Sequence, residues 1–289
     1  MTALAPSPPT PLPQAGEGGS GSIASARDLI ASSGIDASEA RSLLAFVLDA
    51  TREALIARPQ RAVEPDAMAH FGDLCARRAR GEPVAYLLGQ REFFGRLFRV
   101  DRSVLIPRPE TESLVDAALR QLQGVPAPRV LDLGTGSGCI AITLALERPD
   151  AQVWATDISQ PALEVARGNA AALSARVSFL CGRWFAPLRG RFELIVANPP
   201  YVAEGDPHLA ELLCEPREAL TDGADGLSCL VQIMSDAPKY LARGGALLVE
   251  HGYDQGAAVR EFMGRSGFHS IRTLPDLAGI ERVCVGRID

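Results

Sequence analysis

From Arg129 onward, short apolar segments alternate with longer segments in which apolar residues recur at helical spacing. The short segments predict strands at residues 130–133, 152–156, 177–181, 192–197, 246–250 and 280–285. The longer ones predict helices at residues 140–147, 160–172, 227–241 and 255–264. Strands and helices in alternation form a parallel sheet covered by helices, so this part of the chain is expected to fold as an α/β domain.

The first predicted strand runs into a glycine-rich turn, Gly134-Thr135-Gly136-Ser137-Gly138, and then into a helix. Glycine lets such a turn bend sharply and lets a ligand approach the backbone closely. Asp157 closes the second predicted strand. An acid at this position typically accepts hydrogen bonds from the ribose hydroxyls of a bound nucleotide. The alternative role for Asp157 is to cap the helix that begins near Ser159. No Gly-Lys-Ser/Thr follows, so a phosphate-binding P-loop is excluded. A dinucleotide and S-adenosylmethionine both fit the turn and the acid.

The fourth predicted strand ends abruptly at Asn198-Pro199-Pro200-Tyr201. Each proline fixes its own φ and holds the preceding residue extended, which makes a stiff corner where open α/β sheets bind ligands. The corner presents an amide, unpaired carbonyl groups and an aromatic ring, which suit a planar amide or amino group held for methylation. A dinucleotide site prefers G-x-G-x-x-G, so the G-T-G-S-G spacing, Asp132 before it and this corner together favour S-adenosylmethionine.

The chain before the α/β domain divides into three parts. Residues 1–22 are rich in Pro, Gly and Ser and predict a disordered tail. Residues 23–82 carry short helical patterns without strands, which predict a small helical bundle. Residues 83–108 predict a β-hairpin linker with strand-like segments at 84–89, 92–95 and 97–100. Residues 109–289 then form the α/β domain, which opens with a helix over 110–122.

Charge and cysteine usage argue against several classes of protein. The net charge of −6 argues against a protein that coats nucleic acid, because such proteins carry a strong basic excess. The six cysteines include no C-x-x-C pair, so neither a zinc site nor a disulfide framework is predicted, and no metal is expected. No apolar run reaches transmembrane length and no secretory signal opens the chain, so a cytoplasmic protein without a membrane partner is expected.

Over about residues 25–289 the chain resembles the HemK/PrmC family of peptide chain release factor glutamine methyltransferases. The resemblance is carried by the glycine-rich turn, the Asn198–Tyr201 corner, and residues 81–89, 104–112, 215–220 and 248–252. It implies a helical N-terminal substrate-recognition domain, a linking hairpin and a class I S-adenosylmethionine-dependent methyltransferase domain. That domain is Rossmann-like, with a seven-stranded mixed sheet whose last strand runs antiparallel. The implied activity is methyl transfer to the glutamine N5 in the Gly-Gly-Gln loop of release factors.

The resemblance also implies roles for single residues. Gly134 to Gly138 would bind the methionine part and the sugar of the donor, and Asp157 its ribose. Trp184 would pack on the adenine, although a core tryptophan is the alternative for this position. The family usually has an acid immediately before this aromatic residue, whereas Arg183 stands here. Asn198 would contact the donor as well as the substrate.

Asn198 to Tyr201 would hold the glutamine and carry the catalysis. The Asn198 side-chain oxygen and the Pro199 carbonyl are expected to accept the two N–H groups of the amide, while Tyr201 packs on its plane. A methyltransferase for a ribosomal-protein glutamine shares this corner, but residues 106–112 and 215–220 fit the release-factor branch better. A DNA or RNA amino-group methyltransferase would need a basic binding face, so no direct nucleic-acid partner is expected. A binding module without chemistry is disfavoured by the intact turn and Asn198.

Overall fold

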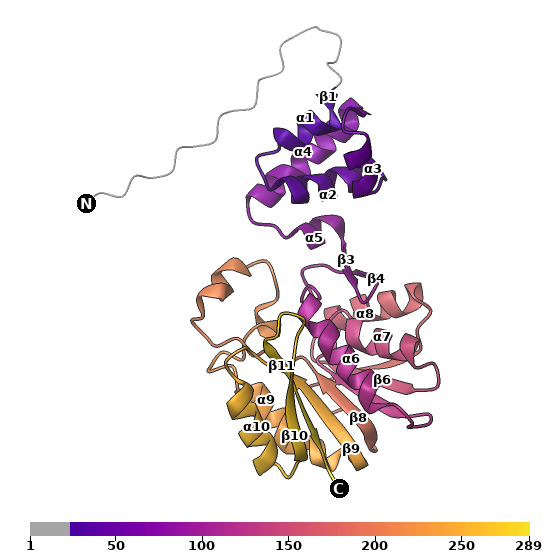
Figure 1. Cartoon of the computed structure of the whole chain (residues 1–289), viewed down its shortest axis with the longest axis vertical. Helices are drawn as coiled ribbons and strands as arrows, with labels where there is room; N and C mark the ends of the chain where they lie inside the picture. The colour runs from indigo at the N-terminus through magenta and orange to yellow at the C-terminus, as the bar shows by residue number, and fades with distance from the viewer. Residues whose placement is uncertain (1–23) are drawn as a thin grey trace, which may run out of the picture. The chain divides into compact units, whose positions relative to one another are not determined.

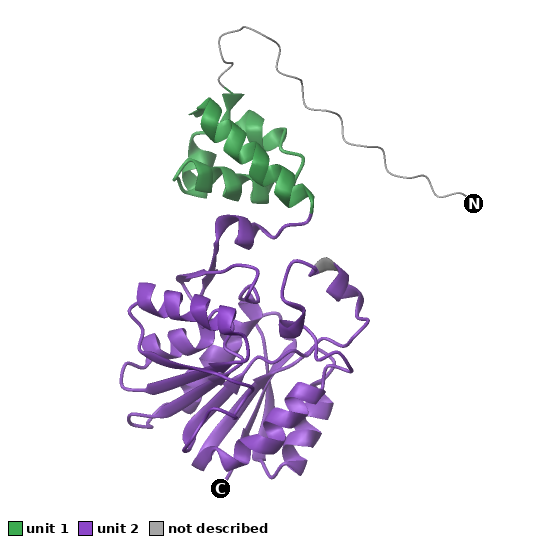
Figure 2. Ribbon diagram, turned by 180° about the vertical axis from the view of Figure 1, so that it is seen from behind, with its two compact units in different colours: residues 1–80 green, residues 81–289 purple. Residues whose placement is uncertain are grey.

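The computed structural model describes residues 24–289, apart from the side chain of Glu211. The predicted disordered tail, residues 1–22, lies outside the described residues. The chain divides into two compact units between Arg80 and Gly81 (Figure 2). Each unit has its own buried residues and is described by itself below.

The first unit is a bundle of short helices whose starts are encoded by capping residues. Its helices are α1 (Ala26–Ala31), α2 (Ala37–Val47), α3 (Arg52–Ala57) and α4 (Pro65–Ala79). The side chains of Ser25, Asp36 and Thr51 accept backbone N–H groups at the first three starts. Contrary to the expectation of helices alone, two-residue strands β1 (Ala24–Ser25) and β2 (Ala62–Val63) pair antiparallel.

The second unit begins with a helix where a strand was predicted. Residues Val84–Leu88 form α5 instead of an extended segment, so that part of the prediction is wrong. Pro83 stands at the start of this helix and Gly89 ends it with φ 68°. A short apolar run between such residues suits a helical turn as well as a strand. The hairpin itself follows as β3 (Gln90–Phe93) and β4 (Arg96–Arg99), paired antiparallel.

The α/β domain is built on one seven-stranded sheet with the order β10-β11-β9-β8-β5-β6-β7. The strands are β5 (Arg129–Leu133), β6 (Gln152–Asp157), β7 (Val177–Cys181), β8 (Phe192–Ala197), β9 (Leu241–Glu250), β10 (His269–Pro275) and β11 (Glu281–Arg287). Strands β5 to β9 pair in parallel, and β11 runs antiparallel to β9. The mixed sheet implied by the family resemblance is therefore confirmed.

Helices cover both faces of this sheet, as the alternating pattern predicts (Figure 1). Their bounds are α6 (Glu112–Gln121), α7 (Cys139–Glu147), α8 (Gln160–Ala172), α9 (Ser228–Asp236) and α10 (Gly256–Arg265), with short 3-10 turns η1 (Pro109–Thr111), η2 (Pro207–Glu211), η3 (Arg217–Ala219) and η4 (Ala237–Lys239). Helices α6 and α7 contribute to one buried apolar cluster, and α9 and α10 to the other. Successive residues of β8 enter the two clusters alternately, so both faces of the strand are buried.

Several predicted bounds differ from the structure by a few residues, β9 most among the strands, since it begins at Leu241 and not at residue 246. The helix predicted over residues 227–241 stops at Asp236, because Pro238 lacks an N–H and turns the chain into η4. Strand β10 was not predicted from the pattern, since it is an edge strand with half-exposed residues and two register shifts against β11.

The order of the strands decides where a ligand can bind. Going along the chain, β6 and β7 add to one side of β5, whereas β8 and β9 add to the other. The carboxyl ends of β5 and β8 therefore lie at a topological switch point, where open α/β sheets have their crevice. The glycine-rich turn follows β5 and the Asn198–Tyr201 corner follows β8, so the two motifs meet there.

Candidate active site

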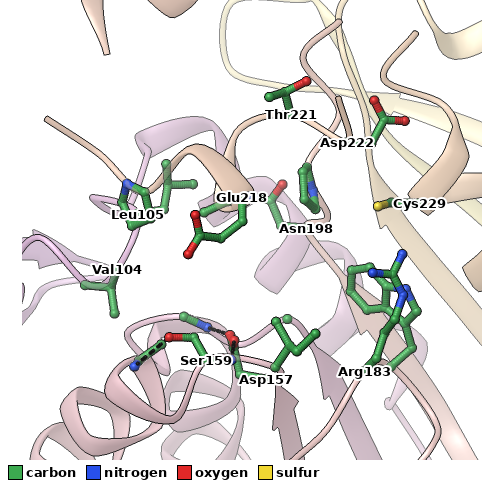
Figure 3. Close-up of a pocket in the computed structure, with 18 of the residues that line it drawn as sticks. Val104, Leu105, Asp157, Ser159, Arg183, Asn198, Glu218, Thr221, Asp222 and Cys229 are labelled. Carbon is green, nitrogen blue, oxygen red and sulfur yellow. Dashed lines mark hydrogen bonds between the residues drawn. The ribbon is translucent and has the colours of Figure 1, made fainter. Parts of the chain in front are cut away.

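A cavity of about 360 Å³ lies at the carboxyl ends of the parallel strands. Five residues singled out from the sequence as donor-binding line it: Gly134, Gly136, Asp157, Trp184 and Asn198. In Figure 3, Asp157, Ser159 and Arg183 lie along one side of the space, and Asn198, Glu218 and Asp222 along the other. The cavity thus brings together residues that follow β5, β6, β7 and β8.

The three glycines of the turn have different surroundings. Gly134 and Gly136 have φ values of 72° and 53° and border the cavity. A side chain at Gly134 would stand 3.3 Å from the Trp184 ring, so glycine lets the ring lie against the turn. Gly138, with φ 82°, lies at the start of α7, where a Cβ would meet Ile142 at 2.8 Å. Its lack of a side chain therefore serves helix packing, and it does not line the cavity.

Thr135 and Ser137 do not line the cavity either, and their side chains are buried. The Thr135 hydroxyl donates to Asp132 Oδ2 over 2.6 Å. The Ser137 carbonyl accepts a hydrogen bond of 2.8 Å from Asn169. Burial raises the pKa of Asp132 to about 7, against the opposing effect of its hydrogen bonds. The Thr135 side chain and the Ser137 carbonyl therefore hold the turn from inside, and neither residue lies in the cavity where the sequence analysis expects donor contacts.

Asp157 holds the turn and the next helix together from the end of β6. Its Oδ2 accepts the Gly136 N–H and its Oδ1 accepts the Ser159 N–H, each over 2.8 Å. The cap of α8 is Ser159 itself, whose hydroxyl accepts from Ala162 N–H. Burial raises the pKa of Asp157 above its ordinary value. A carboxylate has about four acceptor positions, so each oxygen keeps capacity for a ligand hydroxyl.

Trp184 borders the cavity in a backbone conformation that is rare for an aromatic residue, with φ 47°. Its Nε1–H donates to Gln232 Oε1 over 3.1 Å. The same oxygen accepts from Arg183 Nε at 3.3 Å and Nη2 at 3.2 Å. The Arg183 guanidinium carbon lies 5.7 Å from the Trp184 ring centre. Arg183, which stands in place of the usual acid, is thus joined to α9 and helps to hold the ring.

Asn198 is shared between the main cavity and a smaller one of about 100 Å³. The smaller cavity is also lined by Pro199 and Tyr201, and by Leu105 and Arg108 of the segment before η1. The Asn198 amide nitrogen donates to Thr111 Oγ1 over 3.1 Å. No donor among the described residues is bonded to the Asn198 side-chain oxygen or to the Pro199 carbonyl. Two free acceptors therefore lie at the junction of the two cavities.

A buried carboxylate lies behind the corner. Glu250, at the end of β9, is 1% exposed, and its Oε1 accepts the Tyr201 hydroxyl over 3.1 Å. Burial raises the pKa of Glu250 to about 7 and, with the nearby Glu250 charge, raises the pKa of Tyr201. The Tyr201 carbonyl accepts from Gln255 Nε2 over 2.9 Å. The tyrosine is therefore held at both its backbone and its hydroxyl.

The long connection after the corner is fastened over the smaller cavity by an ion pair. Glu215 is 7% exposed; its Oε1 accepts from Arg108 Nη2 over 2.5 Å and its Oε2 from Ile106 N–H over 3.0 Å. The sequence assigned no role to Thr111, Glu215 or Glu250. The one signal for them was that all three fall in the segments that carry the family resemblance.

Neither a metal cluster nor a membrane span is found in the described part of the chain. No group of three or more His, Cys, Asp or Glu side chains in residues 24–289 could hold a metal ion. No helix in the same range is long and apolar enough to cross a membrane.

The sheet order, the antiparallel last strand and the glycine-bordered cavity define a class I methyltransferase fold. A model of the Methyltransferase small domain matches residues 112–263, and one of the PrmC N-terminal domain matches residues 23–89. A solved methyltransferase from Pyrococcus furiosus shares this fold, with a TM-score of 0.52 and 17% identity over 73% of this chain and 96% of that one.

Curated relatives define the family more narrowly. The chain is 53% identical to the release factor glutamine methyltransferase of Neisseria gonorrhoeae, over 86% of this chain and 92% of the relative. It is 51% identical to that of Bordetella pertussis, over 90% of this chain and 98% of the relative. The chain belongs to the family of release factor glutamine methyltransferases.

Proposed function

We propose that this chain transfers the methyl group of S-adenosylmethionine to the side-chain nitrogen (N5) of the glutamine in the Gly-Gly-Gln loop of peptide chain release factors. Such methylation supports translation termination. The observation that carries the proposal is the position of Asn198, whose side chain borders a cavity for the donor and a smaller one for the glutamine. Family membership supports the choice of substrate.

The donor would occupy the larger cavity. Its volume of about 360 Å³ falls within the range of ligand pockets, roughly 300–1,000 Å³. The backbone at Gly134 and Gly136 would lie against the methionine part and the sugar, and Asp157 would accept the ribose hydroxyls. Trp184 would pack on the adenine from the position in which Gln232 holds its indole nitrogen. When bound, the donor supplies an activated methyl group on a positive sulfonium.

The glutamine would enter through the smaller cavity and place its amide beside Asn198. An amide NH₂ has two donors, and the Asn198 side-chain oxygen and the Pro199 carbonyl are the two acceptors left unused there. Tyr201, held by Glu250 and Gln255, would limit movement of the amide plane.

The chemistry asked of these residues is mainly positioning. A carboxamide nitrogen is a poor nucleophile because its lone pair is delocalised into the carbonyl group. Holding it in line with the methyl–sulfur bond can lower the barrier by roughly 7–11 kcal/mol in favourable cases. The two hydrogen bonds strengthen as the nitrogen becomes cationic, and a hydrogen bond to a charged group is worth roughly 1.5–3 kcal/mol. The new N–C bond forms as the sulfur keeps the electron pair, and the methylated amide then loses its extra proton to water.

The same proposal covers the N-terminal unit and the location of the enzyme. Residues 23–82 would select the release factor, which the match to a dedicated N-terminal domain model supports. Because release factors act at ribosomes, the enzyme would work in the cytoplasm.

A comparison of substrates tests the proposal. The full chain is incubated with methyl-labelled S-adenosylmethionine and a purified release factor, a ribosomal protein, or duplex DNA at low salt. Label on the release factor alone is the expected result. Label on the ribosomal protein or the DNA, with none on the release factor, would reject it.

A further inference from the structure

We propose that Glu250 and Thr111 form a positioning pair that orients the Asn198 amide so that its oxygen, and not its NH₂, faces the substrate. The inference rests on the proposed function, because it assigns the orientation of the group that receives the glutamine. Neither residue borders either cavity, so neither is a catalytic residue. Their effect would pass entirely through Asn198.

The Thr111 hydroxyl is the first link. It accepts the Asn198 amide N–H over 3.1 Å, and Thr111 is 2% exposed. A hydroxyl has one proton to donate and two positions at which it can accept. If the Thr111 oxygen accepts from Asn198, its own proton needs another acceptor, and at 2% exposure the side chain does not face bulk solvent.

Glu250 supplies that acceptor. One carboxylate oxygen, Oε1, accepts from the Tyr201 hydroxyl, but the other, Oε2, is buried and has no hydrogen-bond partner among the described residues. In the register of β8 against β9, Ala197 is paired with Val249, so Glu250 stands beside Asn198, the residue that bonds to Thr111. The Thr111 hydroxyl is near enough to favour the charged carboxylate and so to lower the pKa of Glu250 against the effect of burial. A buried oxygen without a donor is costly, so the Thr111 proton is drawn toward it.

The direction of donation then runs one way through three residues. Ionised Glu250 can only accept, so Thr111 donates to it. The Thr111 oxygen is thereby left to accept, so Asn198 turns its NH₂ toward Thr111 and its oxygen toward the substrate. A flipped Asn198 would need the same Thr111 proton and would leave Glu250 Oε2 unpaired.

Protonation of Glu250 would reverse this direction. A protonated carboxyl can donate to Thr111, which can then donate to the Asn198 oxygen and occupy the acceptor that the glutamine needs. The titratable and charged groups that face Glu250 are Tyr201 after β8, Arg282 of β11, Glu110 of η1 and Cys139 of α7. Arg282 lowers the pKa of Glu250 and Glu110 raises it. Burial raises the pKa of both the Tyr201 phenol and the Cys139 thiol, so these two groups stay neutral while Glu250 titrates.

Substitution of Thr111 tests the first link. Thr111→Val keeps the shape but removes the hydroxyl, and we expect kcat to fall about tenfold to a hundredfold while KM for S-adenosylmethionine stays within about twofold. Thr111→Ser keeps the hydroxyl and should restore kcat to within about threefold of wild type. Thr143→Val is the matched control, since Thr143 is buried and its hydroxyl has no partner among the described residues. If Thr111→Val and Thr143→Val have the same kcat, the pair has no positioning role.

The pH dependence tests the second link and does not depend on how well the Thr111 variants fold. In wild type, kcat should fall as pH drops through about 7, where Glu250 gains its proton. Glu250→Gln places a permanent donor beside Thr111, so kcat should be at least about tenfold lower at pH 8.5 and should fall less steeply than in wild type between pH 8 and 6, where Asp132 titrates in both proteins. A variant that keeps wild-type kcat at pH 8.5 would overturn the inference. That result would leave the proposed function standing, whereas wild type that methylates no release factor would overturn the function itself.

Discussion

The side-chain amide of Asn198 donates a hydrogen bond of 3.1 Å to the hydroxyl of Thr111, which lies 87 residues earlier in the chain. Asn198 belongs to the corner after β8, and Thr111 ends the 3-10 turn that leads into α6. The bond joins the Pro107-Arg108-Pro109-Glu110-Thr111 segment to the corner. The orientation of the proposed substrate acceptor is therefore fixed by a segment outside the sheet.

Replacing Asn198 by alanine should nearly abolish methyl transfer. The variant loses the acceptor for one N–H of the substrate amide, and a bond to a developing charge is worth roughly 1.5–3 kcal/mol. With the added loss of alignment, we expect the single-turnover rate to fall at least about a hundredfold. Donor affinity, measured by calorimetry, should change less than about threefold. A near-wild-type rate would contradict the mechanism.

Asp157→Ala should weaken donor binding rather than the chemical step. The carboxylate holds the Gly136 and Ser159 N–H groups and is the proposed ribose acceptor. We expect the dissociation constant for S-adenosylmethionine to rise at least about tenfold. Asp150→Ala is the matched control, because Asp150 is exposed and its Arg148 pair lies outside the cavity. Equal donor affinities in the two variants would show that Asp157 does not hold the ribose.

Most strands and helices of this fold could be predicted from the sequence, because apolar periodicity and turn residues are local signals. Strands 177–181 and 192–197 have the predicted bounds, since each is a short apolar run ended by Gly or Pro. Segment 84–89 was predicted as extended and is helical, because a run of that length fits either state until Pro83 and Gly89 are counted as caps. Edge strand β10 has little apolar character and is stabilised by pairing with β11 on one side.

The sequence motifs of the candidate site could be predicted, but the hydrogen bonds that join them to distant segments could not. Gly134, Asp157 and Asn198 could be placed together because each lies at the carboxyl end of a parallel strand. Thr111 and Glu250 could not be connected to Asn198, since such contacts depend on packing between segments far apart in the chain. The motif predicts ligand contacts for Thr135 and Ser137, whereas both residues are buried and neither lines the cavity.

Alanine at two positions of the glycine-rich turn should have different effects. At Gly138 a Cβ would meet Ile142 at 2.8 Å and Ala166 at 3.1 Å, so Gly138→Ala should lower the free energy of unfolding by on the order of 3 kcal/mol. A Cβ added at Gly136 would have no neighbouring atom within 4 Å, so Gly136→Ala should lower the free energy of unfolding by only about 1 kcal/mol. It should nevertheless lower the affinity for the donor, because Gly136 borders the cavity. Denaturant unfolding and calorimetry measure the two effects. Equal destabilisation by both substitutions would contradict the assignment of Gly138 to packing.

Glu215→Gln should loosen the connection over the smaller cavity. Its side chain is 2% exposed and pairs with Arg108 Nη2 over 2.5 Å. Removing one partner of a largely buried pair leaves the other uncompensated, and we expect a loss of roughly 1–3 kcal/mol in the free energy of unfolding. KM for the release factor should rise more than KM for S-adenosylmethionine, because Arg108 lines only the smaller cavity. Equal changes in both constants would contradict this assignment.

Glu250→Gln should change how stability depends on pH. The folded-state pKa of Glu250 is raised from 4.5 to about 7, so between these values the folded protein holds a proton that the unfolded chain has lost. The contribution of Glu250 to stability is thus present at low pH and is lost as pH rises through this window. As pH rises from 4.5 to 7, the free energy of unfolding of Glu250→Gln should therefore increase relative to that of wild type by about 1.4 kcal/mol per pH unit. Asp132 and His251 also titrate with altered pKa values, but they are common to both proteins. A constant difference in unfolding free energy across this range would contradict the raised pKa.

The most direct test of the central claim is methyl transfer from labelled S-adenosylmethionine to a purified release factor, with its Gly-Gly-Gln loop either intact or changed by Gln→Ala. The wild-type enzyme should label the intact factor on that glutamine, by one methyl group, and should leave the Gln→Ala factor unlabelled. Label of equal extent on both factors would contradict the assignment of the corner at Asn198 to a glutamine amide.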